Sequence, residues 1–324
     1  MLDGPYFDDL SVGQVLDPAP AITIGPGEAA AYQAIAGDPL AMALSRPLAE
    51  RLTGEDGAVV NPTLALHVSI GQSTVATRRV IANLFYRGVR LRRIVRIGDT
   101  LSTRVEIRGL KEGRRRDDRP PRGTALLGIT TTDQDGNVVA DYERCPMLPF
   151  RSTDAAETGH ADDLGAAETE LDWDGWAELA PSWDLAPLPE GEGWSVGEAR
   201  VDPMRDTVSG ALELVRLTQN QAAAHRDPAR GQRGRRLVYG GHTIGLAQAS
   251  LGRQLPSMAT VLGWLSCDHT GPVFESDVLA TTAELVEEHA IDGGRLLAFR
   301  LAVTADRDGD QVDVLDFRPV VLAR

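Results

Sequence analysis

The sequence predicts an α+β protein made of two similar halves, each with one long helix followed by antiparallel strands that wrap around it. Three kinds of segment support this prediction because each occurs once in both halves, in the same order and at nearly the same spacing. They are a helical pattern (61–70 and 239–251), a turn with an Asp at its centre (98–101 and 276–279) and an Asp-rich turn (133–138 and 306–311).

The two helices are predicted from apolar residues that recur at helical spacing after a starting segment. The first pattern follows Asn61-Pro62-Thr63 and runs through Ala65, Leu66, Val68 and Ile70. The second follows Tyr239-Gly240-Gly241 and runs through Ile244, Leu246, Ala247 and Leu251.

The strands are predicted from β-rich runs on both sides of each turn. An Asp-Gly pair between two such runs is a hairpin signal, so we expect two hairpins. The runs that flank the turns are 102–110, 125–132 and 138–147 in the first half, and 280–286, 296–304 and 312–322 in the second.

Composition limits the classes of function. The chain has 324 residues and a net charge of −14, which argues against a general nucleic-acid or anionic-membrane binder. No apolar run reaches the ~18–20 residues of a membrane span, and the N-terminus lacks the features of a signal peptide. Cys145 and Cys267 form no disulfide framework and show no metal-ligand spacing. We therefore expect a soluble cytoplasmic protein with neither a nucleic-acid nor a membrane partner.

An acidic segment separates the halves and divides the chain into residues 1–150, 151–194 and 195–324. The central segment has twelve acidic residues against one base, Arg151, a net charge of −11. It also holds Trp173, Trp176, Trp183 and Trp194, and exposed rings of this size are unfavourable in water. We expect a connector that docks on the fold through its tryptophans, with a short helix near 173–180. A mostly disordered linker is the alternative.

The residues best suited to chemistry lie in the second half. Asn220 and His225 stand five positions apart, and an Arg-rich turn separates them from Tyr239-Gly240-Gly241-His242 at a helix start. Free N–H groups at such a start stabilise an oxyanion, and a His transfers protons. Together they suit the addition of water to an alkene conjugated to a carbonyl group. A lone His is more often a surface or packing residue, so the spacing alone is a weak signal.

Segments 217–227 and 234–243 resemble the MaoC-like (R)-specific enoyl-CoA hydratases, and in particular their mesaconyl-CoA hydratase (β-methylmalyl-CoA dehydratase) branch. The resemblance covers most of the chain outside the connector. The further similar segments are 6–14, 82–90, 98–101, 109–112 and 314–317. The combination of Asn-x4-His with Tyr-Gly-Gly-His is fairly specific, whereas Gly-Asp-Thr-Leu occurs in many hotdog proteins.

This resemblance implies a double hotdog fold, in which two hotdog domains each wrap a curved antiparallel sheet around a long helix. It implies an active site in the C-terminal hotdog, with His225 as general acid and base and Gly241 N–H on the thioester oxygen. The family's usual Asp is Asn220 here, as in the mesaconyl-CoA branch. An amide cannot act as a base, so Asn220 is expected to orient the water. Losing one oxyanion donor costs about 3–4 kcal/mol.

The first half lacks the corresponding residues. Asp38 is followed five positions later by Ala43 instead of a His, and Asn61-Pro62 replaces the glycines at the helix start. Proline has no N–H to offer an oxyanion. We therefore expect the N-terminal hotdog to be non-catalytic and to shape the acyl pocket.

Several residues near the motif are candidates for substrate binding. Tyr239, Gly240 and His242 belong to the helix start. Arg226, Arg235 and Arg236 are the candidates for contact with the phosphates of coenzyme A, and we expect one or two of the loop arginines to make it. A solvated arginine loop is the alternative for the arginines, and a packing or capping role is the alternative for His242. Outside this set, His269 is a strand residue or a supporting site residue, and His67 is expected to be a core histidine with satisfied nitrogens.

The predicted function is that of a hydro-lyase that hydrates an enoyl-CoA or dehydrates a 3-hydroxyacyl-CoA. The acyl group is expected to be branched or carboxylated, as in mesaconyl-CoA. No metal is expected, and no cofactor beyond the coenzyme A of the substrate. The alternatives are a dehydratase for a carrier-protein-bound 3-hydroxyacyl thioester and a non-catalytic hotdog protein that binds acyl thioesters. Asn220 disfavours a thioesterase. A homodimer is one of the oligomeric states that the sequence allows.

Overall fold

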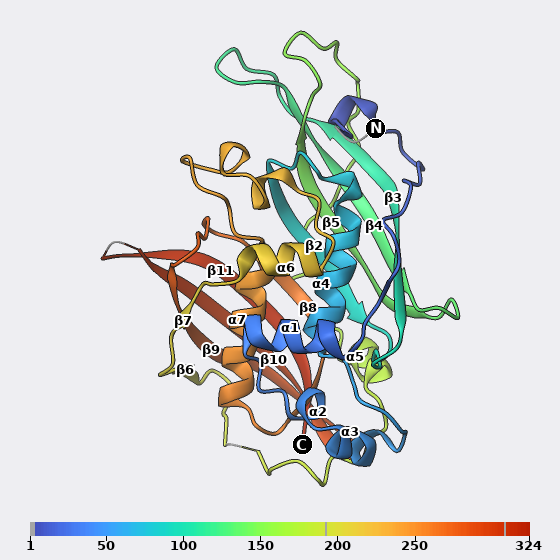
Figure 1. Ribbon diagram of the computed structural model, residues 1–324, viewed down its shortest axis with the longest axis vertical. Coiled ribbons are helices and arrows are strands. Elements are labelled where there is room, and N and C mark those ends of the chain that lie inside the picture. The colour runs from blue at the N-terminus through green and yellow to red at the C-terminus, as the bar shows by residue number, and fades with distance from the viewer. Residues whose placement is uncertain (1–3, 192, 308) are drawn as a thin grey trace.

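One antiparallel sheet runs through the whole molecule, with two central helices against it (Figure 1). The computed structural model describes residues 4–191, 193–307 and 309–324. The strands of the sheet are β1 (Ile22–Thr23), β2 (Ala82–Leu91), β3 (Thr100–Glu112), β4 (Arg122–Thr132), β5 (Val138–Pro149), β6 (Ala199–Val201), β7 (Asp206–Thr207), β8 (Met258–Asp268), β9 (Val278–Ile291), β10 (Gly294–Arg307) and β11 (Asp310–Ala323). The helices are α1 (Pro26–Ala36), α2 (Ala41–Leu44), α3 (Arg46–Thr53), α4 (Pro62–Ser73), α5 (Trp173–Leu179), α6 (Ala211–Leu217) and α7 (Gly240–Gln254).

The strand order shows the two halves as neighbours in this sheet. It runs β1-β3-β4-β5-β2-β8-β11-β10-β9-β6, and β7 also pairs with β9. The halves therefore meet where β2 pairs with β8, at Val89–Trp264 and Arg90–Gly263. A Cβ on Gly263 would lie 2.0 Å from the Val89 carbonyl oxygen, so the approach of the two strands requires glycine there. The predicted α+β class and both hairpins, β4–β5 and β10–β11, are confirmed.

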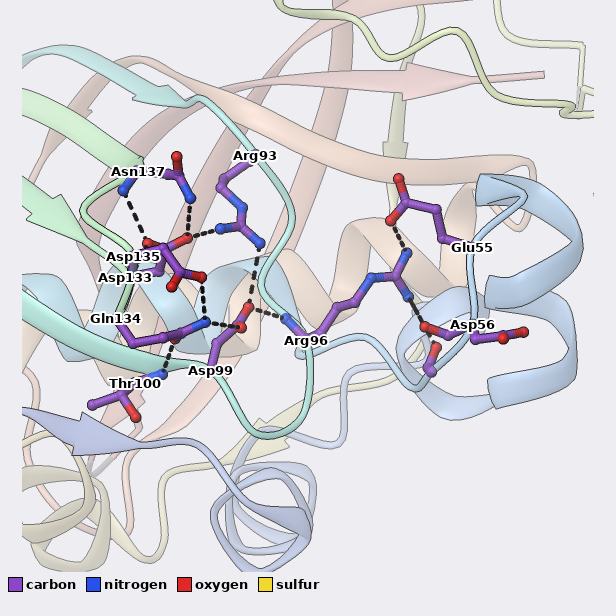
Figure 2. Close-up of polar contacts among 11 residues, drawn as sticks. Glu55, Asp56, Arg93, Arg96, Asp99, Thr100, Asp133, Gln134, Asp135 and Asn137 are labelled. Carbon is purple, nitrogen blue, oxygen red and sulfur yellow. Dashed lines mark hydrogen bonds and ion pairs between the residues drawn. The ribbon is translucent and has the colours of Figure 1, made fainter.

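The two Asp-centred turns repeat the same local hydrogen bond. Oδ2 of Asp99 accepts from the N–H of Arg96 at 2.8 Å, and Oδ2 of Asp277 accepts from the N–H of Phe274 at 2.9 Å. Figure 2 shows that Arg93 lies between Asp99 and Asp133 and forms ion pairs with both carboxylates. In the first half, Arg93 thus joins the turn before β3 to the Asp-rich turn between β4 and β5.

Both central helices are buried on all sides. Every residue of α4 is buried, as are residues 241–252 of α7. A helix that is covered in this way needs no polar face, which explains the largely apolar sequences. Asn61 caps α4 by accepting from the N–H of Thr63 at 2.8 Å, and Pro62 takes the first helical position, where no N–H is needed.

The connector packs on the fold through its tryptophans. Trp176, on α5, is fully buried, and the Arg90 guanidinium lies 3.7 Å from its ring centroid. Trp173 stacks on His289 at 5.5 Å, and Trp194 packs edge-on against Phe299 at 5.2 Å. These contacts confirm both the short helix and the anchoring role predicted for the tryptophans, and they argue against the disordered alternative for the described residues. Across the described residues, no helix is long and apolar enough to span a membrane.

Candidate active site

A cavity of about 320 Å³ lies between the two halves and is lined by both of them. The first half contributes the end of α4 and the turn that follows it, including Thr74. It also contributes Tyr86 from β2 and Arg144 from β5. The second half contributes the loop from Asn220 to Tyr239, the start of α7 and the loop after β8. Asn220, His225, Tyr239 and Gly240, all predicted from the sequence as site residues, are thus brought to one cavity.

The buried Asn220 amide is held by the loop backbone. Its Oδ1 accepts from the N–H of Ala222 at 2.9 Å, and its own N–H donates to the Val215 carbonyl at 2.9 Å. Its Nδ2 is buried and has no hydrogen-bond partner among the described residues. A buried donor without a partner is costly, so this amide is suited to hold a water or substrate oxygen in the cavity.

His225 is oriented by one hydrogen bond. Its Nδ1 lies 3.0 Å from the Leu237 carbonyl oxygen, which only a protonated Nδ1 can bond. Nε2 is then the acceptor nitrogen of the neutral ring. Burial, with the charge of Arg236 adding to it, lowers the pKa of His225 to about 4, although the Leu237 carbonyl acts in the opposite direction. The imidazole is therefore neutral near pH 7 and able to accept a proton.

The first half holds the loop that carries these two residues. The N–H of Gln221 donates to Thr74 Oγ1 at 2.7 Å, and the N–H of Ala223 donates to the Arg78 carbonyl at 2.9 Å. Gly71 of α4 packs so closely on this loop that a Cβ there would lie 1.8 Å from the Thr218 carbonyl oxygen. The first half therefore positions the loop, a role that no local sequence signal indicates.

The start of α7 presents free amides beside the cavity. Tyr239 is the N-cap, so Gly240 and Gly241 are the first two helical residues, whose N–H groups have no partner within a helix. Gly240 lines the cavity, and a Cβ on it would lie 2.4 Å from Nε2 of His269. A Cβ on Gly241 would instead meet the Tyr239 ring at 2.5 Å, and Gly241 is not a lining residue.

The three predicted arginines and His242 do not line the cavity. Arg226 donates to the Asn220 carbonyl at 2.8 Å, and Arg236 pairs with Glu275 at 2.9 Å. Arg235 lies 4.4 Å over the Phe274 ring. These arginines belong to the same segment, between Asn220 and Tyr239, that contributes Gln232 to the cavity. His242 is buried behind the helix start, because the third residue of α7 faces the core.

Other lining residues were not singled out from the sequence. Tyr86, Asn83 and Arg144 come from strands of the first half, and His269, predicted only as a strand or supporting residue, lines the cavity beside Gly240. The sequence signal for Arg144 is a charged residue at a strand position whose side chain faces the interior.

The corresponding place in the first half is small and apolar. A cavity of about 70 Å³ lies at the start of α4, lined by Pro62 and by Trp183 of the connector among others. Asp38 is buried near the start of α4, where its carboxylate accepts from Asn61 Nδ2 at 2.8 Å and from the Leu40 N–H at 3.0 Å. This carboxylate is therefore engaged by its own half.

The core histidines differ from the prediction in one respect. His67 is fully buried, as predicted, but neither ring nitrogen has a hydrogen-bond partner among the described residues, so the expectation of satisfied nitrogens was wrong. Its ring lies 5.9 Å from the rings of both Tyr32 and Tyr239. Burial, and then the nearby His242, lowers the pKa of His67 to about 3, and burial lowers the pKa of His242 to about 4. Both imidazoles are neutral in the folded state.

These depressed pKa values predict a loss of stability in mild acid. Between pH 6.5 and about 4 the unfolded chain binds protons that folded His67 and His242 do not, so the free energy of unfolding falls as the pH falls through this window. We expect the urea midpoint to be lower at pH 5.0 than at pH 7.5, and His67→Leu to reduce this difference. The control His160→Gln should keep it. An unchanged difference in His67→Leu would contradict the assignment.

The chain is similar in sequence to two known enzymes whose names refer to acyl-CoA substrates. No protein-family model matches the chain. The chain is 30% identical to a β-methylmalyl-CoA dehydratase of Chloroflexus aurantiacus, over 94% of this chain and 89% of that protein. It is 28% identical to a mesaconyl-CoA hydratase of Cereibacter sphaeroides, over 95% of this chain and 91% of that protein.

A solved structure shows the same fold over the full length. The Mycobacterium tuberculosis protein Rv0216, described as having a double hotdog fold, superposes with a TM-score of 0.89 and 43% identity, over 99% of each chain. Structures described as MaoC-like dehydratases share the fold as well. The predicted double hotdog is thereby confirmed.

Proposed function

The chain belongs to the family of the β-methylmalyl-CoA dehydratase and mesaconyl-CoA hydratase, and from this premise we propose that it catalyses reversible syn hydration of an enoyl-CoA. The observation that carries the proposal is the convergence of His225, Asn220 and Gly240 on one cavity between the two hotdogs. A proton acceptor, an amide donor and a free helix N-terminus are the groups that this reaction needs.

Each group has a distinct role in the proposed reaction. Asn220 Nδ2 holds the water, and His225 Nε2 removes a proton from it as the oxygen bonds to C3 of the acyl chain. The electrons of the C2–C3 double bond move towards the thioester oxygen, which accepts from the N–H groups at the start of α7. His225 then returns the proton to C2, and dehydration is the reverse.

Gly240 is the residue to which we assign the main oxyanion contact. The resemblance alone pointed to Gly241, but Gly240 lines the cavity whereas Gly241 lies against the Tyr239 ring. Both N–H groups precede the first intrahelical bond of α7, so Gly241 can add to the same positive end of the helix dipole.

The leading substrate is a branched, carboxylated enoyl-CoA such as mesaconyl-CoA. Both curated relatives carry names of such acyl-CoA reactions. Arg226, Arg235 and Arg236, on the loop beside the cavity, are the candidates for contact with the coenzyme A phosphates, a role that suits guanidinium groups. The proposed reaction needs no cofactor, since coenzyme A is part of the substrate.

Spectroscopic assays separate this function from its alternatives. With mesaconyl-CoA and crotonyl-CoA, we expect the enoyl-thioester absorbance to fall on addition of the protein while no free thiol is released. Release of thiol would indicate a thioesterase. Saturable binding of both thioesters without any turnover would contradict the proposal and favour a binding protein. Turnover of a carrier-protein thioester with no turnover of its CoA counterpart would identify the carrier-linked dehydratase.

A further inference from the structure

Arg144 is a charged residue of the first half at the wall of the cavity. It lies on β5, opposite Tyr86 of β2 and Leu127 of β4. Its side chain is only 4% exposed and lines the cavity together with Tyr86. Arg144 therefore lines the same cavity as His225 and Asn220, but from the opposite half of the molecule.

The polar partners of Arg144 are all uncharged. Its Nη2 donates to the Ser73 carbonyl at 3.0 Å and to Thr77 Oγ1 at 2.9 Å. Its Nε is buried without a partner, and no carboxylate in the described part of the chain forms an ion pair with it. Burial raises the pKa of the neighbouring Tyr142 to about 12, so this hydroxyl does not supply a negative charge.

Such a charge is unusual because an arginine cannot shed its proton and an unpaired buried charge is strongly unfavourable. Two arginines of this protein that are less buried than Arg144 have acidic partners. Arg253 pairs with Asp202 at 2.6 Å and with Asp206 at 2.7 Å, and Arg307 forms an ion pair with Asp277. The charge of Arg144 therefore requires an anion that the described residues do not provide.

We propose that Arg144 binds the carboxylate at the far end of the acyl chain and selects dicarboxylic acyl thioesters over simple enoyl thioesters. This inference rests on the proposed function, because it assigns the cavity to the acyl group. The unpartnered charge of Arg144 in the cavity wall suits a charge-assisted hydrogen bond to a carboxylate. The two halves then have different roles, because the second half carries out the reaction and the first half recognises the distal carboxylate of the substrate.

A purely structural role is the competing explanation. Ser73 is the last residue of α4, so Arg144 also donates to the end of that helix, where a positive charge is stabilising. A residue that only held α4 in place would affect every substrate equally. The ratio of activities on two substrates distinguishes the two explanations.

The experiment compares mesaconyl-CoA, which has the distal carboxylate, with crotonyl-CoA, which has none. We expect Arg144→Gln to lower kcat/KM for mesaconyl-CoA about 10- to 100-fold, mostly through KM, and to change that for crotonyl-CoA less than about 3-fold. Arg144→Lys should restore part of the preference. The control Arg108→Gln removes an exposed arginine that pairs with Glu143 at 2.8 Å and should leave both substrates unaffected.

Equilibrium binding of the same two thioesters keeps the test independent of turnover. Equal losses on both substrates in Arg144→Gln would overturn the inference, and so would an unchanged preference in a well-folded variant. If the wild type turned over neither thioester, the proposed function would fail. Selective loss of mesaconyl-CoA binding in Arg144→Gln would then still support Arg144 as the carboxylate site, whereas equal binding losses would refute it.

Discussion

Replacement of His225 by alanine is expected to lower kcat/KM for mesaconyl-CoA by about 10²- to 10⁴-fold, the usual contribution of a general acid and base. The ring is the neutral proton acceptor of the cavity, held by the Leu237 carbonyl at 3.0 Å. The side chain is half-buried and makes this single hydrogen bond, so we expect the thermal unfolding midpoint to change little. Steady-state kinetics and thermal unfolding of the same preparation measure both effects.

A second variant separates proton transfer from positioning. His225→Gln retains a polar group that can donate to Leu237, but an amide cannot accept a proton as a base. We expect it to be as inactive as His225→Ala. His160→Gln, in the connector, serves as the matched histidine control. A wild-type rate in His225→Ala would show that another group moves the proton.

The repeated elements of the fold were predictable because their signals are local. Apolar spacing marked α4 and α7, and the Asp-Gly segments marked two hairpins. The Trp content of the connector predicted docking, and the buried Trp176 confirms it. The pairing of β2 with β8 was not predicted, because it joins residues far apart in the sequence through a close approach at Gly263.

The site was predictable only on the side that carries the motif. Asn220 and His225 share a short loop, so their spacing revealed them. Thr74, which holds that loop, and Arg144, which lines the cavity, come from the other half and enter through tertiary packing. Likewise, helical spacing predicted that His67 is buried, but only the structure shows that its nitrogens lack partners in the part of the chain that it describes.

The start of α7 provides the second large expected effect, because two adjacent glycines face different surroundings. We expect Gly240→Ala to lower kcat/KM about 10²-fold, since a new Cβ 2.4 Å from Nε2 of His269 displaces that ring or the thioester by about 1 Å. The fold should tolerate the change, because the His269 side chain is exposed and alanine is a better helix former than glycine. Kinetics and thermal unfolding test both parts.

Gly241→Ala is expected to act mainly on stability. Its Cβ would lie 2.5 Å from ring atoms of Tyr239, which is only 4% exposed and cannot move into solvent. Overpacking of this kind costs about 1–3 kcal/mol of unfolding free energy. Loss of activity at unchanged stability in Gly240→Ala, with loss of stability first in Gly241→Ala, would place the thioester against Gly240, as the proposed oxyanion contact requires. If Gly240→Ala kept full activity and a folded Gly241→Ala lost it, the thioester oxygen would lie against Gly241, because only the methyl group added there would disturb it.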